Sequence, residues 1–486
     1  MSAALWTGAA IAEATGGRPI GAMPPSVGGV SIDTRSLEPG DVFFAIRGDQ
    51  FDGHAFLRQA IAAGAALLVV AKEKLPALGS LATPMLVVDD VLQALEKLGA
   101  AARARSTARI VAVTGSVGKT TTKEALRHAL EGQGSVHASA ASFNNHWGVP
   151  LSLSRLPVDA RFAVFEIGMN HPGEIRPLVK LVRPHVAIVT LIAPAHLGFF
   201  RDLEEIAEAK GEIFEGLVPG GTAVLNADDP LEPLLRAMAE AEGVTRITTF
   251  GEEPDADYRL LRFAGAGEGS EIAARIDGTE VRVRLPSAGR HLAQNVLAVL
   301  GAADLAGADV TQAAEALSSW RAGKGRGARH VLTLADGGTA TLIDESYNAN
   351  PASMRAALRL LAAAQPGEGA RRIAVLGDML ELGTFSRDLH LALAEPVLEA
   401  RADLVLLAGD EMRALDGALE RLVRHEWLGG PDEVRASLLA HLRDGDVVMM
   451  KASKSIGFSK VVDDLVAQFA APVSGEPAPN EFRQGA

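Results

Sequence analysis

Cysteine is absent from this 486-residue sequence. Its absence excludes a disulfide scaffold, thiolate zinc sites and a cysteine nucleophile, and it fits a reducing compartment. Long apolar runs are also missing, since the longest one, near residues 61–71, is too short to span a bilayer. Residues 1–17 contain Glu13 and lack the basic start of a signal peptide. We therefore expect a cytoplasmic protein that does not insert into a membrane.

Positive charge is in deficit, because 47 Lys and Arg stand against 60 Asp and Glu and give a formal net charge of -13. Nucleic-acid binders usually carry a basic face, so we expect no nucleic-acid partner. Hydrophobic residues make up 48% of the chain and charged residues 22%, which is typical of a globular protein. A chain of this length exceeds one hydrophobic core and predicts two to four domains.

Short apolar strands alternate with helices along most of the chain, which predicts an α/β fold with parallel sheets. We expect three domains and a tail: a small N-terminal α/β domain (1–105), a central parallel-sheet domain (106–318), a Rossmann-like C-terminal domain (319–472) and a disordered segment (473–486). The expected strands cover residues 42–46, 66–71, 85–88, 110–114, 163–166, 186–191, 222–226, 341–344, 372–377, 404–408 and 447–451. The expected helices include 56–63, 92–105, 120–130, 203–217 and 291–306, and the basic, Gly-rich stretch 323–327 is a flexible linker candidate.

A phosphate loop, Thr114-Gly-Ser-Val-Gly-Lys-Thr-Thr121, lies between an expected strand and an expected helix. Its glycines let backbone N–H groups converge on phosphate oxygens. Lys119 would reach the β- and γ-phosphates, and the Thr120 hydroxyl would bind Mg²⁺. Val113 stands where the usual motif has glycine, so the loop is a variant. An ordinary strand-to-helix turn is disfavoured by Gly-Lys-Thr at this place, but GTPase, kinase and ligase all stay open.

Two further polar residues follow expected strands of the same domain. Glu166 ends one strand and His196 follows the next, at the carboxyl ends where parallel sheets bind ligands. A carboxylate and an imidazole there could hold a second Mg²⁺, although each alone could equally be structural. Lys210, on the expected helix 203–217, would by itself be a solvated lysine.

Several segments carry a family resemblance: Asp33-Thr-Arg-Ser36, Gly40-Asp-Val-Phe-Phe-Ala45, Phe51-Asp-Gly-His54, the phosphate loop, Phe143-Asn-Asn-His-Trp-Gly-Val-Pro150, Glu166-Ile-Gly-Met-Asn170, Ala195-His196 and Ala209-Lys-Gly-Glu212. From Ser31 to about Lys460 the chain resembles the Mur ligases of peptidoglycan synthesis. The resemblance implies that the first domain binds the UDP end of the substrate, the second ATP and the third the amino substrate. It also implies an acyl-phosphate intermediate and a monomer.

The resemblance assigns roles within the ATP site. It implies two Mg²⁺ ions held with the help of Thr120, Glu166, His196 and a carbamylated Lys210. It implies catalytic roles for Lys119, Lys210, His196 and Arg326. Nucleotide contacts are expected from Gly115, Ser116, Val117, Gly118, Lys119, Thr120, Thr121, Asn295, Arg326 and Asp344.

Within the family, Tyr347-Asn-Ala-Asn-Pro351 and Gly377-Asp-Met-Leu-Glu-Leu-Gly383 resemble the branch that adds D-alanyl-D-alanine to UDP-N-acetylmuramoyl-tripeptide. The Asp-Asn-Pro-Arg segment of the diaminopimelate-adding branch does not occur. Substrate contacts are then expected from Thr34, Arg35, Ser36, Asp52, His54, Asn144, Asn145, Tyr347, Asn348, Asn350, Asp378, Glu381 and Lys454. The third residue of the tripeptide and the base for the amine stay open, and a nucleotide-driven switch is the alternative from another class.

Overall fold

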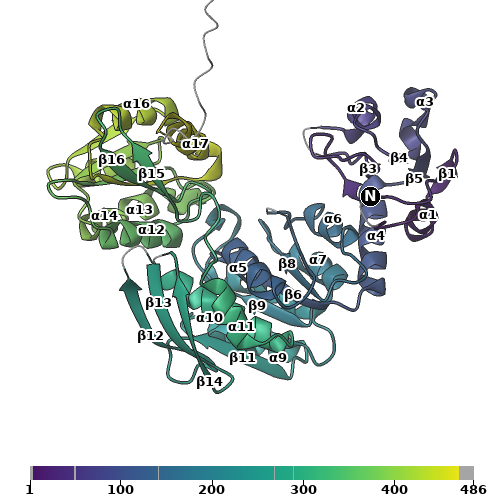
Figure 1. Ribbon diagram of the computed structural model, residues 1–486, viewed down its shortest axis with the longest axis horizontal. Coiled ribbons are helices and arrows are strands. Elements are labelled where there is room, and N and C mark those ends of the chain that lie inside the picture. Colours follow the sequence, from purple (N-terminus) through teal and green to yellow (C-terminus); the bar gives the residue numbers. More distant parts are fainter. Residues whose placement is uncertain (1–3, 49–50, 141, 267–268, 288, 470–486) are drawn as a thin grey trace, which may run out of the picture. The chain divides into compact units, whose positions relative to one another are not determined.

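The computed structural model describes residues 4–48, 51–140, 142–266, 269–287 and 289–469 (Figure 1). The expected disordered tail, 473–486, lies outside the described residues. The chain forms two compact units, Met1–Arg321 and Ala322–Ala486. The first unit contains two separate sheets, and the expected division between residues 105 and 106 stays a prediction. No helix in the described ranges is long and apolar enough to cross a membrane.

The N-terminal sheet has the order β1-β5-β4-β3-β2. Its strands are β1 (Arg18–Ile20), β2 (Val30–Ser31), β3 (Val42–Phe44), β4 (Leu67–Ala71) and β5 (Met85–Val88), and its short helices are α1 (Gly8–Thr15), α2 (Leu57–Ala62) and α3 (Leu75–Leu78). Neighbouring strands are parallel except for the edge strand β1, which is antiparallel to β5. The three strands expected here are confirmed, with β3 ending two residues earlier.

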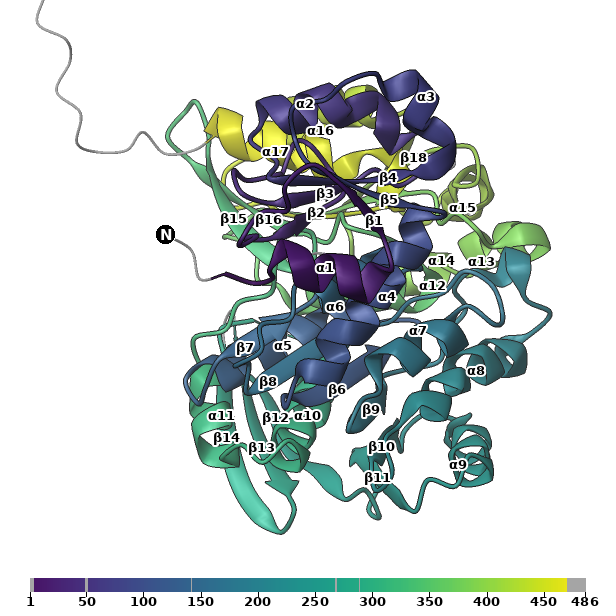
Figure 2. The same cartoon turned by 90° about the vertical axis from the view of Figure 1, so that its right-hand side faces the viewer.

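Helix α4 (Val91–Arg105) joins this sheet to the central part of the unit (Figure 2). Asp90 starts the helix because its side chain accepts a hydrogen bond from the N–H of Gln93 at 2.9 Å. Gly99 lets α6 (Gly148–Ser154) approach closely, since a Cβ there would lie 3.1 Å from the Pro150 carbonyl oxygen. The two sheets of the first unit are therefore held by close helix packing.

The central sheet has the order β14-β13-β12-β11-β10-β9-β6-β8-β7. Its strands are β6 (Arg109–Thr114), β7 (Val136–Ala138), β8 (Phe162–Glu166), β9 (Val186–Val189), β10 (Thr222–Asn226), β11 (Arg246–Gly251), β12 (Tyr258–Ala266), β13 (Gly269–Ile276) and β14 (Thr279–Leu285). The expected strands are confirmed as β6, β8, β9 and β10, although β9 ends at Val189 and not at residue 191. The other five strands were not anticipated.

The expected parallel sheet is confirmed from β7 to β12. The antiparallel pairing of β12, β13 and β14 at one end was not anticipated. Asp277 and Gly278 form the two-residue turn between β13 and β14, with φ of 44° and 77°. An Asp-Gly pair suits such a turn because both positions need positive φ. This pair was the available sequence signal for the hairpin.

Helices pack on both sides of the central strands. They are α5 (Lys119–Glu131), α7 (Ile175–Val182), α8 (Leu203–Gly211), α9 (Glu232–Ala241), α10 (Arg290–Leu305) and α11 (Val310–Leu317). Helices α5, α10 and α11 pack against one another (Figures 1 and 2). The expected helix 203–217 is shorter than predicted, since α8 ends at Gly211 and a 3₁₀ segment, Glu212–Gly216, follows.

The second unit contains a six-stranded sheet of order β15-β16-β20-β17-β18-β19. Its strands are β15 (Ala328–Thr333), β16 (Thr339–Asp344), β17 (Arg372–Gly377), β18 (Leu404–Ala408), β19 (His425–Leu428) and β20 (Val447–Lys451). Its helices are α12 (Pro351–Ala363), α13 (Ser386–Leu391), α14 (Ala394–Glu399), α15 (Arg413–Leu419), α16 (Pro431–His441) and α17 (Phe458–Phe469). Only β15 is antiparallel to its neighbour.

Alternate residues of the central strands in this unit enter two separate apolar cores. Leu376 and Leu407 belong to one core, while Val375 and Leu406 belong to the other. Both faces of the sheet are therefore covered, as in other parallel sheets. The four strands expected here are confirmed as β16, β17, β18 and β20, while the edge strands β15 and β19 were missed.

The stretch 323–327, expected to be a flexible linker, is a hydrogen-bonded turn. The N–H groups of Gly325 and Gly327 donate to the Asp344 carboxylate and carbonyl at 2.7 and 2.8 Å. These bonds attach the turn to the end of β16.

Gly301→Ala is expected to destabilise the protein, although alanine normally favours a helix over glycine by about 1 kcal/mol. Gly301 lies in α10, and a Cβ there would lie 2.2 Å from the Tyr258 ring. Such overpacking costs about 1–3 kcal/mol, which a lower urea-unfolding midpoint would reveal. Gly132→Ala is the control, because Gly132 has φ of -72° and open space around it. Equal midpoints for the two variants would contradict the packing argument.

Candidate active site

The phosphate loop leaves β6, which lies between β9 and β8 in the central sheet. The chain continues from β6 first to the β7–β8 side and later to the β9–β10 side, and ligands bind at such switch points. Gly115 and Gly118 have φ of 142° and 91°, which favours glycine at both places. A Cβ on Gly115 would lie 2.0 Å from the Thr190 hydroxyl oxygen, so this position also lacks room for a side chain.

Thr190 and the residues after β9 hold the loop in shape. The Thr190 hydroxyl oxygen lies 2.6 Å from the Val117 carbonyl and 3.2 Å from the Thr114 carbonyl, and its proton can be donated to either. The Ser116 N–H donates to the Leu191 carbonyl at 2.7 Å. The sequence interpretation missed Thr190, and its signal was a polar residue directly after a buried apolar strand.

Three expected site residues meet beside the loop. The Thr120 hydroxyl donates to Glu166 Oε2 at 2.7 Å, and the Asn144 amide donates to Glu166 Oε1 at 2.8 Å. Glu166 is buried, and its backbone pairs with Val113 of β6. The Lys119 ammonium donates to the Gly115 carbonyl at 2.6 Å and so lies over the loop. Parallel pairing of β6 and β8 brings these side chains to one edge of the sheet.

The Thr120 and Glu166 oxygens fit a magnesium ion. An octahedral Mg²⁺ with bonds of about 2.0–2.1 Å places neighbouring ligands roughly 2.9 Å apart, close to the 2.7 Å between these oxygens. In the part of the chain that the structure describes, no group of three or more His, Asp or Glu residues could hold a metal. A magnesium ion here would therefore complete its shell with phosphate oxygens and water, as is usual for this ion.

His196 lies in the loop after β9, directly before the short 3₁₀ segment Leu197–Phe199, and has φ of 59°. Imidazole is a poorer ligand for Mg²⁺ than a carboxylate. Its expected role as a metal ligand stays a prediction.

Lys210 is buried in α8, so the alternative of a solvated lysine is wrong. Burial lowers the pKa of Lys210 well below its ordinary value, and the positive charge of Lys119 lowers it further. The neutral amine is therefore favoured, and a neutral amine is a nucleophile. Helix α8 is fixed at its start by Asp202, whose carboxylate accepts from the Glu205 N–H at 2.8 Å.

The carboxylate of Glu212 fixes the chain just after Lys210. It accepts hydrogen bonds from the N–H groups of Gly173 and Arg176 at 2.7 and 3.0 Å, at the start of α7. These bonds tie the Lys210 segment to the segment after β8, so Lys210 and Glu166 are held by connected parts of one unit.

Two asparagines of the first unit contact nearby backbone. Asn295 on α10 lies against the loop, because a Cβ on Gly118 would be 2.8 Å from its Oδ1. Asn145 Oδ1 accepts from the Gly148 N–H at 2.9 Å and so caps α6. Their expected contacts with adenine and with the muramoyl peptide stay predictions.

The expected UDP-binding residues lie on loops of the N-terminal sheet. Arg35 is exposed and pairs with Asp33 at 2.6 Å, Thr34 donates to Gln59 at 3.3 Å, and Ser36 donates to the Asp33 carbonyl at 3.4 Å. None of these contacts buries the Arg35 guanidinium, which remains accessible to an anionic group.

His54 and Asp52 are engaged within the fold. His54 Nδ1 lies 2.6 Å from Asp52 Oδ1, and His54 Nε2 accepts from the Ala71 N–H at 2.9 Å. Burial would raise the pKa of Asp52, but hydrogen bonds from Lys74 and His54 outweigh it and hold that pKa below its ordinary value. Both ring nitrogens are used, so His54 shapes the loop whatever its role toward substrate.

The second unit gathers its expected residues at the carboxyl ends of β16, β17 and β20. Asp344 is fully buried and accepts from the Ser346 hydroxyl at 2.5 Å as well as from Gly325. The Tyr347 ring contacts Arg326 and Lys454. The Asn348 carbonyl accepts from the Lys451 ammonium at 2.8 Å.

Asn350 caps α12, and its Oδ1 accepts from the Ser353 N–H at 2.9 Å. Asp378 accepts from the Met412 N–H at 2.9 Å, and burial raises its pKa. Glu381 lies on the same loop with φ of 64°. Contacts of these residues with the amino substrate stay predictions.

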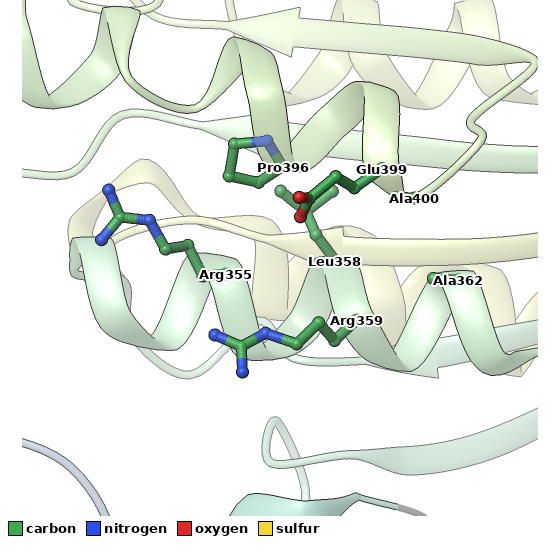
Figure 3. Close-up of a pocket in the computed structure, with 7 residues that line it drawn as sticks. All are labelled: Arg355, Leu358, Arg359, Ala362, Pro396, Glu399 and Ala400. Carbon is green, nitrogen blue, oxygen red and sulfur yellow. The ribbon is translucent and has the colours of Figure 1, made fainter.

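A small cavity between α12 and α14 lies away from these strand ends (Figure 3). It has a volume of about 50 Å³ and is lined by Arg355, Leu358, Arg359, Ala362, Pro396, Glu399 and Ala400. Both guanidinium groups extend away from Glu399 (Figure 3). A space of this size cannot hold a nucleotide or a dipeptide, so it is not the site.

The buried strand, the glycine loop, Lys119 and the Thr120–Glu166 pair define a P-loop nucleotide-binding α/β protein. Comparison with known proteins identifies it further. Residues 26–131 match the model for the Mur ligase family catalytic domain, 113–303 the Mur ligase middle domain and 328–454 the Mur ligase glutamate ligase domain.

Several relatives that match along most of the chain share one name. A UDP-N-acetylmuramoyl-tripeptide--D-alanyl-D-alanine ligase from Escherichia coli (strain K12) is 36% identical over 90% of this chain and 93% of that protein. A MurF crystal structure from Acinetobacter baumannii has a TM-score of 0.81 and 30% identity, covering 95% of this chain and 99% of that one. MurF ligase from Thermotoga maritima, solved with ADP, has a TM-score of 0.74 and 25% identity over 91% of this chain and 97% of that one. The chain belongs to the Mur ligase family.

Thr190→Val is expected to weaken ATP binding, because the Val117 and Thr114 carbonyls lose the hydroxyl that orders the loop. An unpaired carbonyl costs about 1–3 kcal/mol, which corresponds to a rise of roughly 5- to 150-fold in the ATP dissociation constant. Isothermal titration calorimetry measures this constant. Thr190→Ser keeps the hydroxyl and should bind like the wild type. If both variants bound equally well, the hydroxyl would have no part in shaping the loop.

Proposed function

We propose that this chain is an ATP-dependent ligase that joins D-alanyl-D-alanine to UDP-N-acetylmuramoyl-tripeptide in the cytoplasmic stage of peptidoglycan synthesis. The observation that carries the proposal is the likeness to ligases of that name along 90% of the chain, at 36% identity. The phosphate loop and the Thr120–Glu166 pair supply a suitable ATP site.

The first step transfers a phosphoryl group. A carboxylate oxygen of the tripeptide bonds to the γ-phosphorus of ATP, the bond to the β,γ-bridging oxygen breaks, and ADP leaves. Such a step needs charge neutralisation and alignment more than covalent help. The N–H groups of the loop and the Lys119 ammonium supply donors for the phosphate oxygens. Magnesium held by Thr120 and Glu166 would add positive charge at these oxygens.

The second step forms the amide. The amine of D-alanyl-D-alanine bonds to the acyl carbon, the bond to the phosphate oxygen breaks, and phosphate leaves with one proton lost from the amine. Asp378, Glu381 and Lys454 are the proposed contacts of the dipeptide, an acidic group for its ammonium and a cation for its carboxylate. Thr34, Arg35 and Ser36 are the proposed contacts at the UDP end.

We also propose that Lys210 is carbamylated and, with His196, helps to hold a second Mg²⁺. The neutral Lys210 amine would form an N–C bond to CO₂ and lose one proton, which turns an uncharged group into a carboxylate. Support comes from burial and from the lowered pKa, since only the neutral amine reacts. A carboxylate at this place would also put an anion beside the Lys119 cation, where a second positive charge is disfavoured.

The proposed function predicts that phosphate release from ATP requires both UDP-N-acetylmuramoyl-tripeptide and D-alanyl-D-alanine. Both substrates are required because the tripeptide carboxylate accepts the phosphoryl group and the dipeptide amine then displaces phosphate. A coupled phosphate assay, with diaminopimelate and lysine as alternative amines, measures it. Steady release with neither substrate, or with GTP alone, would instead favour a nucleotide-driven switch.

Lys210→Ala is expected to lower kcat by about 100-fold or more, as removal of one charge-stabilising group commonly does. Formate or acetate should restore part of the activity, because a free carboxylate can take the place of the carbamate. The same phosphate assay, with and without added carboxylate, measures both effects, and wild-type enzyme with the same additive is the control. Full activity of the variant without rescue would refute the carbamate.

A further inference from the structure

The Tyr347 ring contacts two cations in the second unit. The Arg326 guanidinium carbon lies 4.0 Å from the ring centroid, and the Lys454 ammonium lies 5.7 Å from it. Both distances fall within the roughly 6 Å over which an aromatic face attracts a cation. Tyrosine is scarce here, with two in the whole sequence.

The backbone on the Arg326 side is clamped to Tyr347. The Tyr347 N–H donates to the Gly325 carbonyl at 3.1 Å, and the Gly325 N–H donates to the Asp344 carboxylate at 2.7 Å. Gly325 has φ of 75°, and a Cβ there would lie 2.8 Å from the Tyr347 Cβ. The turn that carries Arg326 therefore follows the position of the Tyr347 backbone.

The backbone on the Lys454 side is held by a buried lysine. The Lys451 ammonium donates to the Asn348 carbonyl at 2.8 Å and lies 3.5 Å from the Glu345 carboxylate. The Lys454 N–H points to Asn348 Oδ1 at 3.4 Å, near the limit of a hydrogen bond. Three segments that are distant in sequence thus meet around one ring.

Like charges repel, and flexible cationic side chains in water would move apart. The negative face of the ring opposes this separation, and the clamped turns limit how far each side chain can move. The family resemblance assigns Arg326 to ATP phosphates, and the proposed function gives Lys454 to the dipeptide carboxylate. One ring therefore contacts two cations that are each assigned to a different substrate.

We propose that Tyr347 is a positioning residue whose ring holds Arg326 and Lys454 in place, so that binding of the ATP phosphates and of the dipeptide carboxylate both depend on it. This inference rests on the proposed function. It differs from a direct substrate contact by the Tyr347 hydroxyl, because the ring face and not the oxygen carries the effect.

Tyr347→Leu, which keeps an apolar side chain but removes the π face, tests the inference. The KM for ATP and the KM for D-alanyl-D-alanine should both rise by about 3- to 30-fold, the range of a cation–π contact. Tyr347→Phe keeps the face and should raise both KM values by clearly less than Tyr347→Leu does. Circular dichroism and thermal unfolding establish that each variant is folded.

A double-mutant cycle separates positioning from general damage. Lys454→Met combined with Tyr347→Leu should raise the KM for the dipeptide by less than the product of the two single effects, because both changes remove the same contact. Independent effects, unchanged KM values in Tyr347→Leu, or a Phe variant as impaired as the Leu variant would each overturn the inference.

A crystal structure of Tyr347→Leu gives a readout that does not depend on activity. Both cationic side chains should leave their wild-type positions, and retention of both would refute the inference even if the protein proved not to be a ligase. Failure of the proposed function would instead appear in the wild type, as phosphate release that needs no dipeptide.

Discussion

The close contact between Gly115 and Thr190 determines the shape of the phosphate loop. Because a Cβ on Gly115 would meet the Thr190 hydroxyl at 2.0 Å, the loop after β6 can lie against the segment after β9 only without a side chain. The same hydroxyl then reaches the Val117 carbonyl. This contact sets where α5 begins, and with it the place of Lys119 and Thr120. The Thr120–Glu166 hydrogen bond extends the arrangement to β8, so three neighbouring strands form one site.

Two buried lysines of the first unit show what burial of charge requires. Lys123 is fully buried, but its ammonium lies 2.9 Å from a Glu124 oxygen and donates to the Ser139 carbonyl at 2.7 Å. Lys210 is buried in the neighbourhood of a like charge, Lys119, and its pKa is lowered. A buried group that is pushed toward its uncharged form marks a functional site more often than a paired one does. Lys123 is therefore a structural lysine, whereas Lys210 is a candidate for a chemical role.

Much of the fold could be predicted because buried parallel strands are continuous apolar runs, as at β6, β8, β17 and β18. The strands that were missed, β1, β2, β7, β11 to β15 and β19, mostly lie at or near sheet edges, where polar residues interrupt the pattern. The loop and the meeting of Thr120 with Glu166 were also predictable, since Thr120 lies in the first turn of the helix after the loop and Glu166 ends a strand. The hydrogen bonds of His54, Asn145, Asn350 and Asp344 to nearby groups were not, because a motif does not indicate which local donor or acceptor a polar side chain meets.

The amino-acid sequence by itself determined the α/β class, the phosphate loop and the family, since these depend on local apolar patterns and on motifs read residue by residue. Tertiary structure decided the rest. The burial of Lys210, the contact of Thr190 with the loop and the meeting of Arg326 and Lys454 on the Tyr347 ring each join segments that are distant along the chain. Solvent exclusion and close packing arise only when those segments are brought together, and they lower the pKa of Lys210 and fix the shape of the loop.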